Sequence, residues 1–117
     1  MHIYTGYVYI WYNIKSKLYY IGSHYGRVED SYICSSKIMK PIYNHHPEIF
    51  KFRVLQYCND SDKNLKLIEQ RWLNMIKSTE LFSTQNIDNG TCRYYNINPW
   101  ATGGVGSNIG KQKRRKG

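Results

Sequence analysis

Two stretches near the N-terminus are rich in β-branched and aromatic residues. Residues 6–12 (GYVYIWY) form the first and residues 18–22 (LYYIG) form the second, and Asn, Lys and Ser lie between them. This composition predicts a β-hairpin, because such residues favour strands and the intervening ones favour turns. A turn centred on residues 14–15 would place Tyr9 opposite Tyr20, within cross-strand contact.

Later patterns predict a third strand and two helices. Residues 50–57 alternate in character and predict the strand. A longer helix is expected over residues 62–77, where apolar positions recur at intervals of three and four, as in an amphipathic helix. A short helix is expected from about Lys37, capped by Ser35 or Ser36. The members of the apolar stripe in the longer helix are Leu65, Ile68, Trp72 and Ile76.

The remaining segments have no regular period. Residues 23–36 and 78–94 therefore predict loops, and residues 95–100 (YNINPW) predict a short ordered segment. The order of elements predicts an α+β fold with a small three-stranded antiparallel sheet flanked by helices. We expect this domain to occupy residues 1–100, and residues 101–117 to form a glycine-rich, basic, flexible tail.

The charge balance indicates an anionic partner. Seventeen Lys and Arg face eight Asp and Glu, which gives a net charge of +9, and residues 111–117 (KQKRRKG) supply five of the positive charges. The chain also contains twelve tyrosines. A basic, tyrosine-rich domain predicts a nucleic-acid binder, through phosphate contacts and base stacking. A merely basic protein without such a partner is the alternative.

Other features of the composition argue against several protein classes. The three cysteines contain no CxxC pair, which disfavours a secreted disulfide scaffold or a zinc ribbon and favours a reducing cytosol. No apolar run reaches the roughly 18 residues of a membrane span, and the first residues do not resemble a signal peptide. We therefore expect a cytoplasmic protein without a membrane partner.

Glu69 lies on the apolar stripe of the longer helix instead of its wet face. A buried carboxylate is costly unless a positive charge compensates for the loss of water. Glu69 could reach solvent at the edge of the stripe, could pair with an arginine, or could bind a metal ion. Mg²⁺ is commonly held by one carboxylate together with phosphate oxygens and waters.

Several motifs resemble those of the GIY-YIG nucleases, most closely the phage and homing-type members. Tyr7-Val8-Tyr9 stands where that family has its first tripeptide, and Tyr20-Ile21-Gly22 matches the second. Glu69 precedes Trp72 by three residues, as in the family's metal-binding helix, and Tyr95-Asn96-Ile97 matches a later segment. The resemblance covers roughly residues 7–100.

The resemblance implies a metal-dependent endonuclease that hydrolyses phosphodiester bonds in double-stranded DNA. Glu69 would hold one Mg²⁺ or Mn²⁺ ion. Tyr9 would activate or position the attacking water as a general base, and Tyr20 would orient water or phosphate. Asn96 would support the site by hydrogen bonding. The enzyme would act as a monomer or as a dimer assembled on DNA.

The family's phosphate-binding arginine has no direct equivalent, because residue 30 is an aspartate. Arg27, His24 and Lys37 are the candidates for this role, in that order. The missing arginine also keeps open a non-catalytic DNA- or RNA-binding module on the same fold. A small structural or ribosome-associated protein is a third interpretation, which predicts RNA binding without cleavage.

Overall fold

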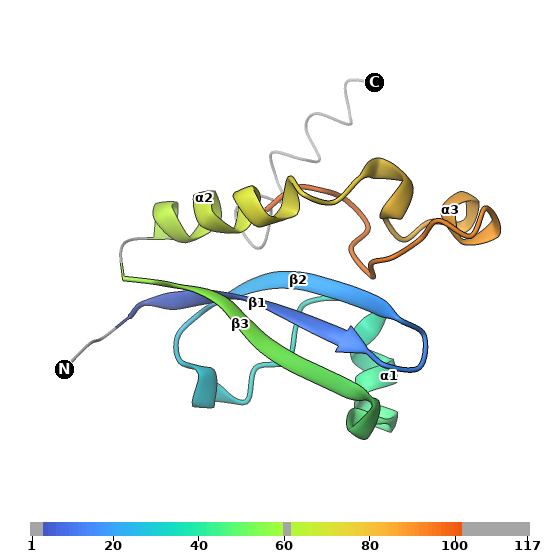
Figure 1. Cartoon of the computed structure of the whole chain (residues 1–117). Coiled ribbons are helices and arrows are strands. Elements are labelled where there is room, and N and C mark those ends of the chain that lie inside the picture. Colours follow the sequence, from blue (N-terminus) through green and yellow to red (C-terminus); the bar gives the residue numbers. More distant parts are fainter. Residues whose placement is uncertain (1–3, 60–61, 102–117) are drawn as a thin grey trace.

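A three-stranded antiparallel sheet forms the centre of the computed structural model, which describes residues 4–59 and 62–101 (Figure 1). The strands are β1 (Gly6–Asn13), β2 (Leu18–Tyr25) and β3 (Phe50–Cys58), in the order β2-β1-β3. The central strand β1 thus lies between two edge strands. The predicted α+β class, the hairpin and the third strand are confirmed.

The turn between β1 and β2 is one residue shorter than the sequence suggested, because Asn13 belongs to β1. The side chain of Asn13 accepts hydrogen bonds from the backbone N–H of Lys15 and of Ser16, which orders the four-residue connection. The register pairs Tyr9 with Gly22 instead of with Tyr20. The expected pairing was therefore wrong by two residues, because the turn is not centred on residues 14–15.

Strand β2 also continues three residues further than expected. Ser23, His24 and Tyr25 pair with the beginning of β1, although their sequence shows no strand period. The strand ends at Gly26, whose φ of 128° is accessible to glycine and whose N–H donates to the carbonyl of Thr5. This extension places Ser23 and His24 on the sheet and not on a loop.

The two faces of the sheet are covered by different helices (Figure 1). Helix α2 (Asp62–Leu73) covers one face, where Val8 and Ile21 are buried together with Leu65 and Leu73. Helix α1 (Met39–His45) and the segment before it lie on the other face. The core on that side contains a row of aromatic residues from β1: Tyr7, Tyr9 and Trp11.

The helices follow the sequence pattern in part. Helix α1 begins at Met39, two residues later than predicted, and Ile38 occupies the N-cap position instead of a serine. The hydroxyl of Ser36 still accepts from the N–H of Met39 at 2.9 Å, and Pro41 lies in the first turn. Helix α2 ends at Leu73, four residues early, although Ile76 remains buried after it. A third helix, α3 (Thr84–Asp88), was not predicted. Short 3₁₀ helices span Val28–Asp30, Pro47–Ile49 and Ser78–Glu80.

The segment after α3 returns to the outer edge of β2. Tyr94 forms a parallel bridge with Tyr19, and the N–H of Tyr95 donates to the carbonyl of Tyr19 at 2.6 Å. The predicted ordered segment is therefore a short addition to the sheet. The predicted flexible tail lies, but for Ala101, outside the described residues. Across the described ranges, no helix has the length and apolar character needed to cross a membrane.

Candidate functional site at the edge of strand β2

The hydroxyl of Tyr9 lies directly over Gly22 of the neighbouring strand. A Cβ atom placed on Gly22 would be only 2.5 Å from the Tyr9 Oη, so a glycine is required for this approach. The ring of Tyr20 borders the same space, and the two ring centroids are 6.3 Å apart. The structure thus brings the two predicted site tyrosines together, diagonally across the strands instead of directly opposite.

A third tyrosine completes this cluster. The ring of Tyr32 lies 6.3 Å from that of Tyr9, and the two side chains share a hydrogen bond. The hydroxyls of Tyr20 and Ser35 are 3.2 Å apart and share another. Tyr32 and Ser35 were not recognised from the sequence, because they lie in an aperiodic connection whose path cannot be read from residue spacing.

The environment keeps these tyrosines protonated. Burial raises the pKa of Tyr9 well above its ordinary value, and the neighbouring Tyr20 and Tyr32 add to the effect. Burial also raises the pKa of Tyr20 to about 12. In the absence of a bound cation, both hydroxyls therefore act as hydrogen-bond donors at neutral pH. A protonated Tyr9 hydroxyl can position a water by hydrogen bonding, but it must lose its proton before it can act as the general base that the resemblance implied.

Glu69 approaches the same strand from the α2 side of the sheet. Glu69 is 8% exposed, and its Oε1 accepts a 2.6 Å hydrogen bond from the hydroxyl of Ser23. The ammonium group of Lys66 lies 3.5 Å from the same oxygen. The burial expected from the apolar stripe is confirmed, and the pairing partner is a lysine from the preceding helical turn instead of an arginine.

The carboxylate is electrostatically coupled to the tyrosines, although it reaches β2 from the opposite face. Its charge contributes to the raised pKa values of Tyr9, Tyr20 and Tyr32. Ser23, which binds the carboxylate, directly follows Gly22, which lies against Tyr9. Glu69 and the tyrosines therefore lie against the same Gly22–Ser23 stretch of β2, from opposite faces of the sheet.

The three candidate cations lie in different surroundings. The imidazole of His24 stacks on Tyr32 with ring centroids 4.1 Å apart, and its Nε2 lies 3.1 Å from the Oδ2 of Asp30. The side chain of Arg27 is 66% exposed and pairs with Glu29 at 3.7 Å. Lys37 is exposed before α1. Of the three, His24 is the one that packs against the tyrosine cluster, so the structure favours it over Arg27.

Asp30 holds His24 in place. A hydrogen bond from the backbone N–H of Arg27 and the contact with His24 lower the pKa of the Asp30 carboxyl, so the group is ionised at neutral pH. The ionised Asp30 carboxylate is a hydrogen-bond acceptor beside Nε2 and so orients the imidazole ring of His24. The sequence identified His24 as a candidate but did not predict its contact with Asp30.

Asn96 supports the strand without facing a reactant. Its side chain is buried, accepts from the N–H of Ile21 at 3.0 Å and donates to the carbonyl of Ile21 at 2.9 Å. These bonds satisfy the backbone of the edge strand immediately before Gly22. They agree with the supporting role that the resemblance implied for Asn96.

The donor atoms near Glu69 suit a hard cation. A carboxylate and the hydroxyl of Ser23 are oxygen ligands, which Mg²⁺ prefers, and waters and phosphate oxygens would complete the shell. Within the described ranges, no group of three or more His, Cys, Asp or Glu could hold a metal ion. The donors therefore fit an ion that is bound jointly with a phosphate, and not a closed structural site.

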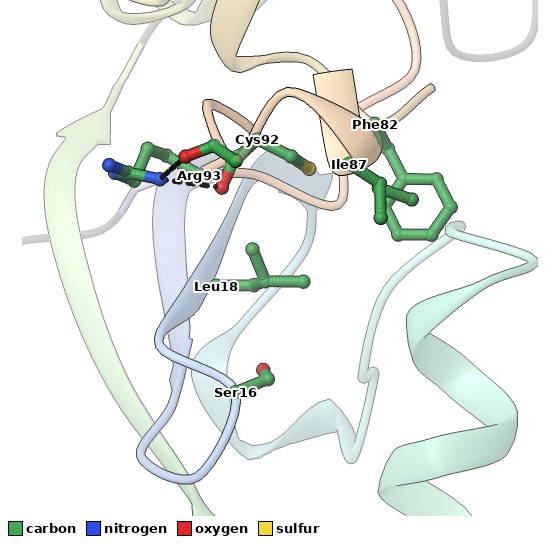
Figure 2. Close-up of a pocket in the computed structure, with 7 residues that line it drawn as sticks. Ser16, Leu18, Phe82, Ile87, Cys92 and Arg93 are labelled. Carbon is green, nitrogen blue, oxygen red and sulfur yellow. Dashed lines mark hydrogen bonds between the residues drawn. The ribbon is translucent and has the colours of Figure 1, made fainter. Parts of the chain in front are cut away.

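A cavity in the described part of the molecule lies elsewhere. A cavity of about 370 Å³ separates the β1–β2 turn from the segment around α3, and Figure 2 shows Leu18 facing Ile87 and Phe82 across it. None of the residues singled out above lines it.

Comparison of the chain with protein-family models, with curated proteins and with solved structures gave no match. The resemblance to the GIY-YIG nucleases therefore remains a prediction from motifs. What supports a function is the grouping of Tyr9, Tyr20, His24 and Glu69 around the Gly22–Ser23 step of β2.

Proposed function

We propose that the chain is a metal-dependent endonuclease of the GIY-YIG type that cleaves double-stranded DNA in the cytoplasm of a bacterial or phage-infected cell. The observation that carries this proposal is the buried Glu69 carboxylate at the edge of β2, next to a cluster of protonated tyrosines. A net charge of +9 supplies attraction to phosphate.

Each residue has a defined task in this proposal. Glu69 would hold one Mg²⁺ or Mn²⁺ ion, which polarises the phosphate and stabilises the leaving oxygen when it is bound. Tyr9 and Tyr20 present neutral hydroxyls that position the attacking water and a phosphate oxygen. His24, held by Asp30 through Nε2, would in its imidazolium form donate from Nδ1 to the phosphate and stabilise its developing charge.

Lys66 neutralises the negative charge of Glu69 when no cation is bound. Its ammonium group contacts both the Glu69 carboxylate and the Ser23 hydroxyl at 3.5 Å. A bound cation would take over this contact, and the flexible lysine would then be available to a phosphate. The buried carboxylate therefore has a positive partner with and without the ion.

The test is nicking of supercoiled plasmid by the full chain with and without Mg²⁺. We expect Mg²⁺-dependent nicking that Glu69→Gln abolishes, while DNA affinity measured in chelator stays within about threefold. Glu29→Gln is the matched control, because it removes a carboxylate that is exposed and paired with Arg27. Equal nicking by wild type and Glu69→Gln would contradict the assignment.

One observation favours a second candidate, a DNA- or RNA-binding module without catalysis. The Glu69–Lys66 pair neutralises the carboxylate without any ion, so the fold does not require metal. This alternative predicts tight binding, and no nicking in Mg²⁺ or Mn²⁺, for wild type and Glu69→Gln alike.

A further inference from the structure

A second aromatic surface lies on the face of the sheet that carries α2. Tyr12 of β1 pairs directly with Tyr19 of β2, and Tyr19 is bridged to Tyr94. The ring centroids of Tyr12 and Tyr19 are 4.6 Å apart, and those of Tyr19 and Tyr94 are 5.6 Å apart. The three half-buried rings form a continuous row across the strands, which we call the tyrosine row.

The tyrosine row is separate from the candidate site. Side chains alternate along a strand, so Tyr12 lies on the same face as Val8, and Tyr9 lies on the opposite face. Along the strands, Tyr12 and Tyr19 are at the turn end of the hairpin, whereas Ser23 and Glu69 meet at the other end. A ligand on the row would not need to occupy the tyrosine cluster at Gly22.

Positive charges accompany the row. Lys51 of β3 pairs with Tyr12 in the sheet, and Arg53 follows two residues later on the same face. Both are exposed, and neither has an acidic partner in the portion of the chain that the structure describes. Arg93 precedes Tyr94, and Figure 2 shows its guanidinium directed away from the cavity. One acid, Glu80, is near enough to help raise the pKa of Tyr94.

We propose that the tyrosine row binds unpaired bases of single-stranded nucleic acid, with Lys51 and Arg53 contacting the phosphates. Aromatic rings stack on any exposed base face, and neighbouring cations follow the backbone. The unpaired positive charges favour an anionic ligand over an apolar protein partner. A duplex offers its phosphates but hides its base faces. This inference goes beyond the proposed cleavage and does not depend on it.

The test compares two fluorescently labelled strands of equal length, oligothymidine and an abasic deoxyribose-phosphate chain. Binding to the full chain is measured in chelator, so cleavage cannot interfere. We expect wild type to prefer oligothymidine, and Tyr12→Ala and Tyr19→Ala each to lose about tenfold in that affinity but little for the abasic strand. Tyr12→Phe and Tyr19→Phe should retain the preference, because they keep the stacking ring.

Two further measurements keep the proposal decisive if an alanine variant fails to fold. Lys51→Gln should weaken binding of both strands equally and reduce the salt slope by about 0.7, the value for one phosphate contact with a single strand. Tyr25→Ala, at the far end of β2, is the control and should change nothing. A duplex that competes as well as the single strand, or no preference for oligothymidine in wild type, would overturn the proposal. So would phenylalanine variants that lose as much affinity as the alanine variants.

Discussion

The substitution Gly22→Ala tests whether the position of the Tyr9 hydroxyl matters. A Cβ atom on residue 22 would lie 2.5 Å from the Tyr9 Oη, 2.8 Å from its Cζ and 3.0 Å from Cε2 of Tyr20. Carbon atoms in contact normally stay about 3.5–4.0 Å apart. The backbone of Gly22 is not among the positive-φ glycines, so alanine brings no conformational strain of its own. The entire effect must come from the displaced rings.

The expected loss of stability follows from overpacking. Tyr9 is 1% exposed and is surrounded by other aromatic rings, so it cannot swing into solvent. Inserting a methyl group into such a site costs about 1–3 kcal/mol in the free energy of unfolding. In a domain of this size, this corresponds to a decrease in Tm of roughly 5–15 °C. Urea and thermal denaturation measure both quantities.

The same substitution should lower the nicking rate more than tenfold, since misplacing a positioning group by about 1 Å can cost two orders of magnitude. The double variant Gly22→Ala/Tyr9→Leu is the control, because leucine lacks both Tyr9 atoms that the new Cβ would meet, Oη and Cζ. The loss in free energy of unfolding for the double variant should be smaller than the sum of the losses for the two single variants, because the two residues are in contact. Additive effects of the two changes would refute the proposed collision, and a stable Gly22→Ala protein with normal nicking would refute the role of Tyr9.

Three further predictions concern charge and protonation. His24→Ala should lower kcat by about tenfold or more and Arg27→Ala by less than threefold, because His24 packs on the tyrosine cluster and Arg27 is exposed; single-turnover nicking measures both, and equal losses would contradict the order. Folding raises the pKa of Tyr20 from 10.0 to about 12, so the stabilisation from its protonated hydroxyl is complete below pH 10 and is lost as the pH rises toward 12. Urea unfolding measured at several pH values should show this decline in the free energy of unfolding, and the decline should be smaller in Tyr20→Phe. Deletion of residues 111–117 removes five positive charges and should reduce the salt slope of duplex binding by up to about 4.5 without moving the cut sites, which a cleavage map would reveal.

The sequence predicted those elements whose side chains repeat with a regular period. Alternation indicated the hairpin and β3, and the apolar stripe indicated α2. Helix α3 was missed because it is short and is ordered by local polar contacts, such as the hydrogen bond from the N–H of Asn86 to the hydroxyl of Ser83. The hairpin register was missed for a similar reason: the side chain of Asn13 sets the turn, and strand composition says nothing about it.

The candidate site was predictable only where a residue violated the pattern of its element. Glu69 stood out because a carboxylate interrupted an apolar stripe. Ser23 and Tyr32 did not stand out, since a serine near a strand end and a tyrosine in a loop are ordinary. Their importance comes from contacts between segments far apart in the chain, such as the Ser23–Glu69 hydrogen bond across 46 residues.

Two violations of local rules meet at one place in the fold. A glycine within a strand weakens it, and a buried carboxylate on a helix costs solvation energy. Gly22 and Glu69 are 47 positions apart in the sequence, yet the glycine makes room for Tyr9 and the next residue, Ser23, binds the carboxylate. Because sequences keep such departures mainly where function requires them, their convergence at β2 supports the proposed site by an argument that uses no motif.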